Sequence, residues 1–194
     1  KVLIKEGIIH MKKLTKKDIS QKAIDLFLEK GYNNVTINDI CQACDITKPT
    51  FYKYAGSKED LILDLYDLSI NHLTKDPYYF IEANSHYEQL IMVFHKLIAD
   101  TESFGSDLFS QMLISNLTED HHSFDMRTEL TRICTLIIKK AQEKGEIKNM
   151  NPPEILYNTI AYTFTGYEVS WCIKKGELDF RGELYNSIIA ILDV

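Results

Sequence analysis

Apolar residues recur through most of the chain at the spacing of an amphipathic α-helix. Ile19, Ala23 and Leu26 fall on one helical face, and the apolar residues between Met126 and Ala141 repeat this spacing over several turns. The sequence contains no Asn-Gly or Asp-Gly hairpin pair and no strict alternation of apolar and polar residues. The pattern predicts an all-α fold of about nine helices.

Polar capping residues indicate where these helices begin. Thr15 stands three residues before Asp18, and Thr36 stands three residues before Asp39. Each pair is a capping box, which satisfies free backbone N–H groups at a helix start. Similar signals, with glycine or proline as stops, predict nine helices over residues 16–30, 37–44, 48–54, 57–72, 85–98, 108–117, 126–145, 153–175 and 181–192, with a break at Pro77.

The second and third of these helices have the spacing of a helix-turn-helix. Only Asp45, Ile46 and Thr47 join them. The turn needs a residue that accepts a positive φ angle, and Asp45 is an acceptable choice. The third helix carries hydroxyl and ammonium groups, which can bind phosphate oxygens and base edges in the major groove. The pair therefore predicts DNA binding, with residues 48–54 as the recognition helix.

The charge distribution agrees with this prediction, although the net charge of −6 does not. Residues 1–60 carry 11 Lys and Arg against 8 Asp and Glu, a net charge of +3. Residues 61–194 carry 11 against 20, a net charge of −9. A small basic part on a larger acidic part is typical of a DNA-binding domain joined to a body of another function.

The run from Ile40 to Tyr54, followed by Gly56-Ser57-Lys58-Glu59-Asp60-Leu61, resembles the TetR/AcrR family of transcriptional regulators. The resemblance extends over about residues 15–65. It implies a homodimeric repressor whose N-terminal domains bind a palindromic operator in double-stranded DNA. It also implies a C-terminal helical body that binds a small-molecule inducer, with dimerisation through the last two helices.

The resemblance also implies roles for individual residues. Tyr52 and Lys58 correspond to phosphate contacts, and Thr36 to a helix cap that also contacts the DNA backbone. Lys48, Thr50 and Lys53 correspond to residues that face the groove. The expected DNA-binding residues are Thr36, Thr47, Lys48, Pro49, Thr50, Tyr52, Lys53, Tyr54 and Lys58.

These assignments divide the chain into three parts. Residues 1–10, which precede Met11, are expected to be a leader or tag-like segment, residues 11–56 the helix-turn-helix domain, and residues 57–194 the body for ligand binding and dimerisation. No apolar run approaches the ~18 residues of a membrane span, so no membrane partner is expected. The four scattered cysteines favour the reducing cytoplasm as the location.

The body is rich in aromatic residues, especially over residues 157–171. Aromatic walls with a few hydroxyl groups suit a mostly apolar ligand. Residues 149–173 contain no lysine or arginine, which argues against a strongly anionic ligand beside this helix. The expected pocket residues are Phe94, Phe104, Phe109, Met112, Tyr162, Thr163, Gly166, Tyr167 and Trp171.

Two other functions remain open at this point. Cys41 and Cys44 have a redox-motif spacing, so a thiol-responsive regulator is one alternative, although both lie on the apolar face of a short helix. A helical-bundle adaptor that does not bind DNA is the other. His121 and His122 follow Glu119 and Asp120, but adjacent side chains point in different directions, so we expect a solvated loop and no metal site. No catalytic motif is found, and we expect neither an enzyme nor a cofactor.

Overall fold

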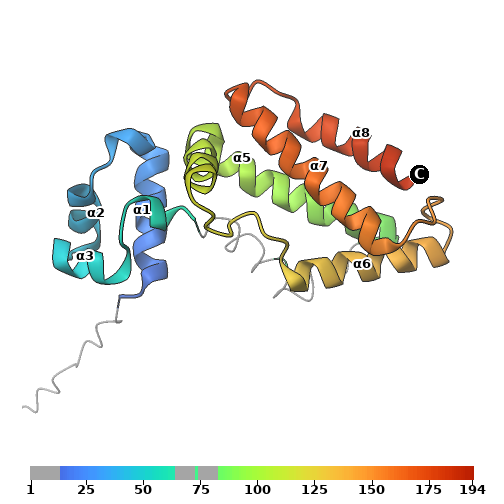
Figure 1. The fold of residues 1–194 in the computed structure, drawn as a ribbon, viewed down its shortest axis with the longest axis horizontal. Helices are drawn as coiled ribbons and strands as arrows, with labels where there is room; N and C mark the ends of the chain where they lie inside the picture. Colours follow the sequence, from blue (N-terminus) through green and yellow to red (C-terminus); the bar gives the residue numbers. More distant parts are fainter. Residues whose placement is uncertain (1–13, 64–72, 74–82) are drawn as a thin grey trace, which may run out of the picture.

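The computed structural model describes residues 14–63, residue 73 and residues 83–194 (Figure 1). Every regular element in these ranges is a helix, and none is a strand, as expected for an all-α protein. The elements are α1 (Lys16–Lys30), η1 (Tyr32–Asn34), α2 (Ile37–Cys44), α3 (Lys48–Tyr54), η2 (Glu59–Leu61), α5 (His86–Thr118), α6 (Thr128–Glu143), α7 (Pro153–Ile173) and α8 (Phe180–Leu192).

The described residues contain seven α-helices, so the expected number of nine requires a correction. The helices expected over 85–98 and 108–117 belong to one element, α5, which has a kink at Gly105 (φ 75°, ψ 154°). The segment expected from residue 57 begins as the 3₁₀-helix η2, and its continuation over 64–72 lies outside the described residues. The break expected at Pro77 and the leader expected over 1–10 also lie outside them.

Helices α1, α2 and α3 form a small unit, which we call the head (Figure 1). Ile19, Ile40 and Phe51, one from each helix, are fully buried in its core. The capping boxes expected at Thr15 and Thr36 are both confirmed. Because the caps satisfy the free N–H groups at the starts of α1 and α2, these short helices are well defined at their first turns.

Helices α5 to α8 form a second unit, which we call the body. Its core contains a row of tilted aromatic rings: the Phe164 ring lies 6.1 Å from that of Phe94 and 5.4 Å from that of Phe180, measured between centroids. The Trp171 ring lies 6.2 Å from that of Phe180. These rings join α5, α7 and α8, and α6 packs against α5 and α7. No described helix is long and apolar enough to cross a membrane.

The head and the body meet where the second half of α5 lies beside α1 (Figure 1). The loop that follows α5 contributes a further contact, because the Ser123 hydroxyl donates to the Leu63 carbonyl over 3.2 Å. On the head side, the Tyr32 hydroxyl donates to Oε1 of Glu59 over 2.8 Å. These contacts join the segment that follows α3 to both units.

Candidate nucleic-acid interface

The turn between α2 and α3 has the geometry of a helix-turn-helix. Asp45 lies in the left-handed region (φ 53°, ψ 47°), which confirms the positive φ expected for it. The amide of Ile46 donates to the Cys41 carbonyl over 2.9 Å and so closes the end of α2. Thr47 then caps α3 by accepting from the Thr50 amide, and Pro49 lies in the first turn, where its missing N–H costs nothing.

Helix α3 has one buried and one exposed face. Phe51 is completely buried, and it holds α3 against the other helices of the head. Lys48, Pro49 and Lys53 are exposed, and 53% of the Tyr52 surface is exposed. The free face of α3 thus presents ammonium and hydroxyl groups, which are the side-chain donors that contact phosphates and base edges.

Threonine hydroxyls order both helix starts on this side of the head. The Thr36 hydroxyl accepts from the Asp39 amide over 3.2 Å, and the Asp39 carboxylate accepts from the Thr36 amide over 2.7 Å. The hydrogen bond from Thr36 holds the pKa of the Asp39 carboxyl below its ordinary value. The hydroxyl groups of Thr47 and Thr50 are hydrogen-bonded to each other over 3.0 Å. These polar groups therefore have defined positions before any DNA is bound.

Two of the expected DNA-binding residues are turned into the protein. The Tyr54 hydroxyl donates to the Leu14 carbonyl over 3.1 Å. The Lys58 ammonium donates to the carbonyls of Tyr32 and Val35 over 2.8 and 3.1 Å, and it lies 3.9 Å from the centre of the Tyr32 ring. The phosphate contact that the family resemblance implies for Lys58 would require the ammonium to leave these carbonyls.

Asn38 and Gln42 were not among the expected residues, although both are exposed on α2. They line a groove between α2 and α3 together with Asp45, Thr47 and Lys48. Asparagine and glutamine amides can form paired hydrogen bonds with adenine. Their spacing of four residues on the first helix of the motif is the signal that would have identified them.

The body contains a mostly apolar cavity between α5, α6 and α7, with a volume of about 110 Å³. Of the nine residues expected to form a ligand pocket, Phe94 and Tyr162 line it. Gly166 does not, because it is exposed and a Cβ atom added to it would meet nothing within 4 Å. The residues that line the cavity are Phe94, Leu97, Ser123, Phe124, Asp125, Met126, Arg127, Leu130, Tyr157, Ala161, Tyr162, Phe164 and Thr165.

The other expected pocket residues have packing roles elsewhere in the body. Phe109, Met112 and Trp171 are buried in the core. Phe104 is half-buried against that core, and the Tyr167 hydroxyl lies 2.9 Å from the Ser187 hydroxyl on α8. Thr163 donates to the Thr159 carbonyl of its own helix, so its hydroxyl is used within α7.

The cysteines of the described residues are all buried as free thiols. Burial raises the pKa of the Cys44 thiol, and it raises that of Cys134 to about 12. A raised pKa leaves little thiolate, which is the reactive form. The burial of both thiols, together with the raised pKa of Cys44, therefore favours packing over redox chemistry for Cys41 and Cys44.

Comparison with known proteins agrees with the geometry of the head. Residues 19–65 match the family model of the bacterial regulatory proteins of the tetR family. The uncharacterized HTH-type transcriptional regulator YuxN from Bacillus subtilis is 43% identical over 47 residues, which are 24% of this chain and 16% of that protein. A second uncharacterized HTH-type regulator from the same organism, YdeS, is 24% identical over 166 residues, which are 80% of this chain and 82% of that protein.

The whole chain also resembles solved structures with this architecture. The crystal structure of FadR from Thermus thermophilus, a TetR-family transcriptional repressor in complex with lauroyl-CoA, superimposes with a TM-score of 0.70. Its sequence is 21% identical, and the alignment covers 91% of this chain and 93% of that one. The body thus shares the fold of a repressor that binds a small molecule. Residues 19–65 thus match the tetR family of bacterial regulatory proteins, and the chain has the fold of a solved TetR-family repressor.

Proposed function

We propose that the chain is a homodimeric repressor that leaves a palindromic operator when a mostly apolar small molecule binds to its body. In this proposal residues 11–56 recognise DNA in the cytoplasm, and residues 57–194 bind the ligand and form the dimer. The tetR-family match over 19–65 supports the first role. The arrangement of α5 to α8 around an apolar cavity supports the second.

The exposed face of α3 is the observation that carries the proposal. Lys48, Thr50 and Lys53 face the major groove when α3 enters it, and Tyr52 reaches a phosphate oxygen. Thr36 and Thr47 lie at the starts of α2 and α3, where free amides also favour a phosphate, although each helix is short. In this arrangement each chain contacts one half-site of the DNA operator.

A second apolar face on α7 supports the homodimer. A surface helix of a monomer needs one apolar face, which in α7 is the buried one. Ile155, Tyr162 and Ile173 lie on α7 with 57%, 67% and 72% of their surfaces exposed, and Ile189 on α8 is 43% exposed. Gly166 is exposed on α7 with open space beside it, which allows a helix of a second copy to approach closely. A two-fold dimer through α7 and α8 would bury these residues and match a palindromic operator.

The ligand is proposed from the cavity and from one structural relative. Phe94, Leu130 and Tyr157 are buried side chains along the cavity, which also has Arg127 and Thr165 on its wall. The Thermus regulator with the same fold was solved with lauroyl-CoA, which has a long apolar chain. We therefore propose a ligand with an apolar chain that enters between α5, α6 and α7.

Helix α5 provides a physical connection between the ligand and the head. Its first half contributes Phe94 and Leu97 to the cavity, and its second half packs against α1. The kink at Gly105 separates the two halves. A ligand that binds one arrangement of α5 more tightly shifts the population toward it. If that arrangement changes the spacing of ~34–36 Å between the two recognition helices, binding to DNA weakens by the same coupling free energy.

The experiment that tests this function is selection of bound DNA from a random pool, followed by anisotropy measurements with the selected sequence. We expect an inverted repeat, and we expect lauroyl-CoA to lower the affinity for it while raising the melting temperature of the protein. If no DNA sequence is enriched from the pool, a helical-bundle adaptor that does not bind DNA would be the better reading. Release of DNA by a thiol oxidant, with no effect of apolar ligands, would favour the thiol-responsive regulator.

Sedimentation tests the dimer separately. The wild-type chain of 22.5 kDa should sediment as a species of twice that mass. Ile173→Glu places a charge on the exposed face of α7 and should give a monomer. Leu117→Glu is the matched control, because Leu117 is 86% exposed on α5, outside that face, and should leave the dimer intact.

A further inference from the structure

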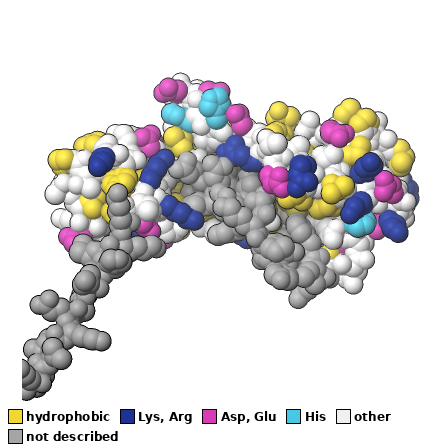
Figure 2. Space-filling view, turned by 90° about the horizontal axis from the view of Figure 1, so that it is seen from below, with side chains coloured by type: hydrophobic (Ala, Val, Ile, Leu, Met, Phe, Trp, Pro, Cys, Tyr) yellow, Lys and Arg dark blue, Asp and Glu magenta, His cyan; other side chains and the backbone are white. Residues whose placement is uncertain are grey.

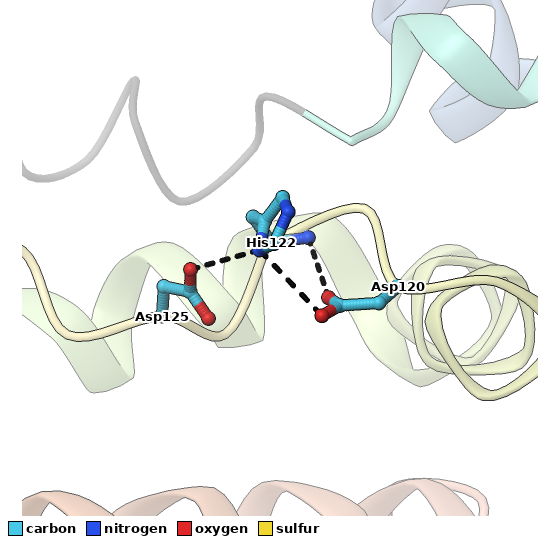
Figure 3. A group of neighbouring side chains, drawn as sticks. All are labelled: Asp120, His122 and Asp125. Carbon is cyan, nitrogen blue, oxygen red and sulfur yellow. Dashed lines mark hydrogen bonds and ion pairs between the residues drawn. The ribbon is translucent and has the colours of Figure 1, made fainter.

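The loop between α5 and α6 brings together three side chains that commonly ligate metals. The ligand atoms of Asp120, His122 and Asp125 all lie within 4.8 Å of one another (Figure 3). Nδ1 of His122 lies 3.0 Å from Oδ2 of Asp125 and 3.6 Å from Oδ2 of Asp120. The two carboxylates therefore face the same imidazole nitrogen from two sides.

These separations fit a single bound ion. Zinc binds imidazole nitrogen and carboxylate oxygen at ~2.1 Å, so two ligands of a tetrahedral ion stand ~3.4 Å apart. The two separations from His122 lie on either side of that value, and all three ligand atoms lie within 4.8 Å of one another. An ion can therefore enter with small side-chain movements, with water as a fourth ligand.

The composition of the cluster selects the kind of ion. Two carboxylates supply two negative charges, which a divalent cation neutralises. The imidazole nitrogen favours zinc and similar first-row transition ions over magnesium and calcium, which prefer oxygen ligands alone. The side chains of Asp120, His122 and Asp125 are 75%, 72% and 63% exposed, so an ion in solution reaches them directly.

Contacts on the other side of the loop hold its backbone without any ion. The Arg127 guanidinium donates to the carbonyls of His122 and Asp125 over 3.1 and 2.7 Å. Ser123 is buried, and its amide donates to Oδ1 of Asn116 over 3.3 Å. The His122 amide donates to Oδ1 of Asp120 over 2.9 Å. The ligand positions are thus set by the protein, which reduces the ordering that ion binding requires.

We propose that Asp120, His122 and Asp125 form a binding site for a divalent transition-metal ion at the junction of head and body. His122 and Asp125 line a hollow that also includes Lys16 of α1 and Asp60 of η2. Figure 2 shows histidine and acidic side chains gathered on the surface that projects between the two units.

This proposal differs from the expectation of a solvated loop without a metal site that the sequence alone indicates. The sequence pattern places His121 and His122 beside Glu119 and Asp120, and adjacent side chains diverge. Asp125 completes the cluster because the loop turns back at His122, which has a positive φ angle of 60°. Nothing in the linear spacing of these residues indicates that turn.

The experiment is calorimetric titration of the full chain with zinc chloride, and with magnesium chloride for comparison. We expect one zinc ion per chain and much weaker binding of magnesium. His122→Gly removes the imidazole and suits the positive φ, and Asp125→Asn removes one charge. Each should lower zinc affinity at least ~10-fold. His121→Ala removes the neighbouring histidine, which is outside the cluster, and should change the affinity by less than about twofold.

Three results would overturn the proposal. The first is no saturable binding of zinc to the wild-type chain. The second is zinc binding that survives both cluster variants, which would place the ion elsewhere, for example on cysteines. The third is a greater loss of zinc affinity in the His121→Ala variant than in the His122→Gly variant. Because the cluster lies in an exposed loop, circular dichroism and the melting temperature should be unchanged in all three variants, and DNA binding is not needed as a readout.

Discussion

Lys58 gives the sharpest test of how the head is held together. Lys58→Met keeps the aliphatic stem but removes the ammonium that donates to the carbonyls of Tyr32 and Val35. Those carbonyls lie between α1 and α2, so the contact fixes the start of the helix-turn-helix. We expect the variant to fold but to unfold more easily than the wild type.

The magnitude follows from the lost contacts. Hydrogen bonds to a charged group contribute ~1.5–3 kcal/mol when well buried, and a cation over an aromatic ring contributes ~0.5–1 kcal/mol at an exposed site. Lys58 is half-buried, and the screening by water lowers both figures. We therefore expect a loss of ~1–2 kcal/mol in the free energy of unfolding. For a chain of this size, this corresponds to a melting temperature lower by about 2–8 °C.

The assay combines urea unfolding with the salt dependence of DNA binding. Lys53→Met is the matched control, because Lys53 is exposed on α3, the proposed recognition helix. We expect Lys58→Met to lose stability and keep its salt slope, and Lys53→Met to keep its stability and flatten the slope by about one unit. Wild-type stability in Lys58→Met, with a flattened slope, would refute this reasoning and support the phosphate contact that the family resemblance implies.

Three further predictions concern the caps and the cavity. Thr36→Ala removes the N-cap of α2 and should cost ~1 kcal/mol in urea unfolding, and an unchanged midpoint would contradict that role. Because the folded pKa of Asp39 is lowered, its stabilising effect is present above the ordinary pKa of 3.8 and disappears as pH falls through the folded value. The stability difference between wild type and Asp39→Asn should therefore shrink in acid titration, and a constant difference would reject the capping argument. Ala161→Phe should fill the cavity and abolish the response to lauroyl-CoA in anisotropy while DNA binding persists, and a full response would show that the ligand binds elsewhere.

The head was predictable because its signals are local. Each of its helix starts depends on a threonine and a residue three positions later, and the turn depends on the tolerance of Asp45 for a positive φ angle. The position of the Lys58 ammonium was not predictable, because its partner Tyr32 lies 26 residues away in the chain. Contacts of that kind depend on the packing of the head and not on neighbouring residues.

The body was predictable as a set of helices but not in its details. Gly105 reads as a break between two helices, whereas the structure accommodates its positive φ as a kink in one element. Helix α7 is apolar on two faces, and periodicity does not tell which face borders a cavity and which is exposed. The sequence predicts Gly166 in the pocket, whereas the structure places it on the exposed face.

The spacing of the half-sites shows whether two copies of α3 read DNA as one rigid pair. Anisotropy would compare the selected inverted repeat with a version in which about five base pairs, half a helical turn, are inserted between the half-sites. We expect a loss of affinity of at least ~10-fold for a rigid pair, because the second copy of α3 then faces the wrong side of the duplex. Equal affinity for the two DNA molecules would contradict it.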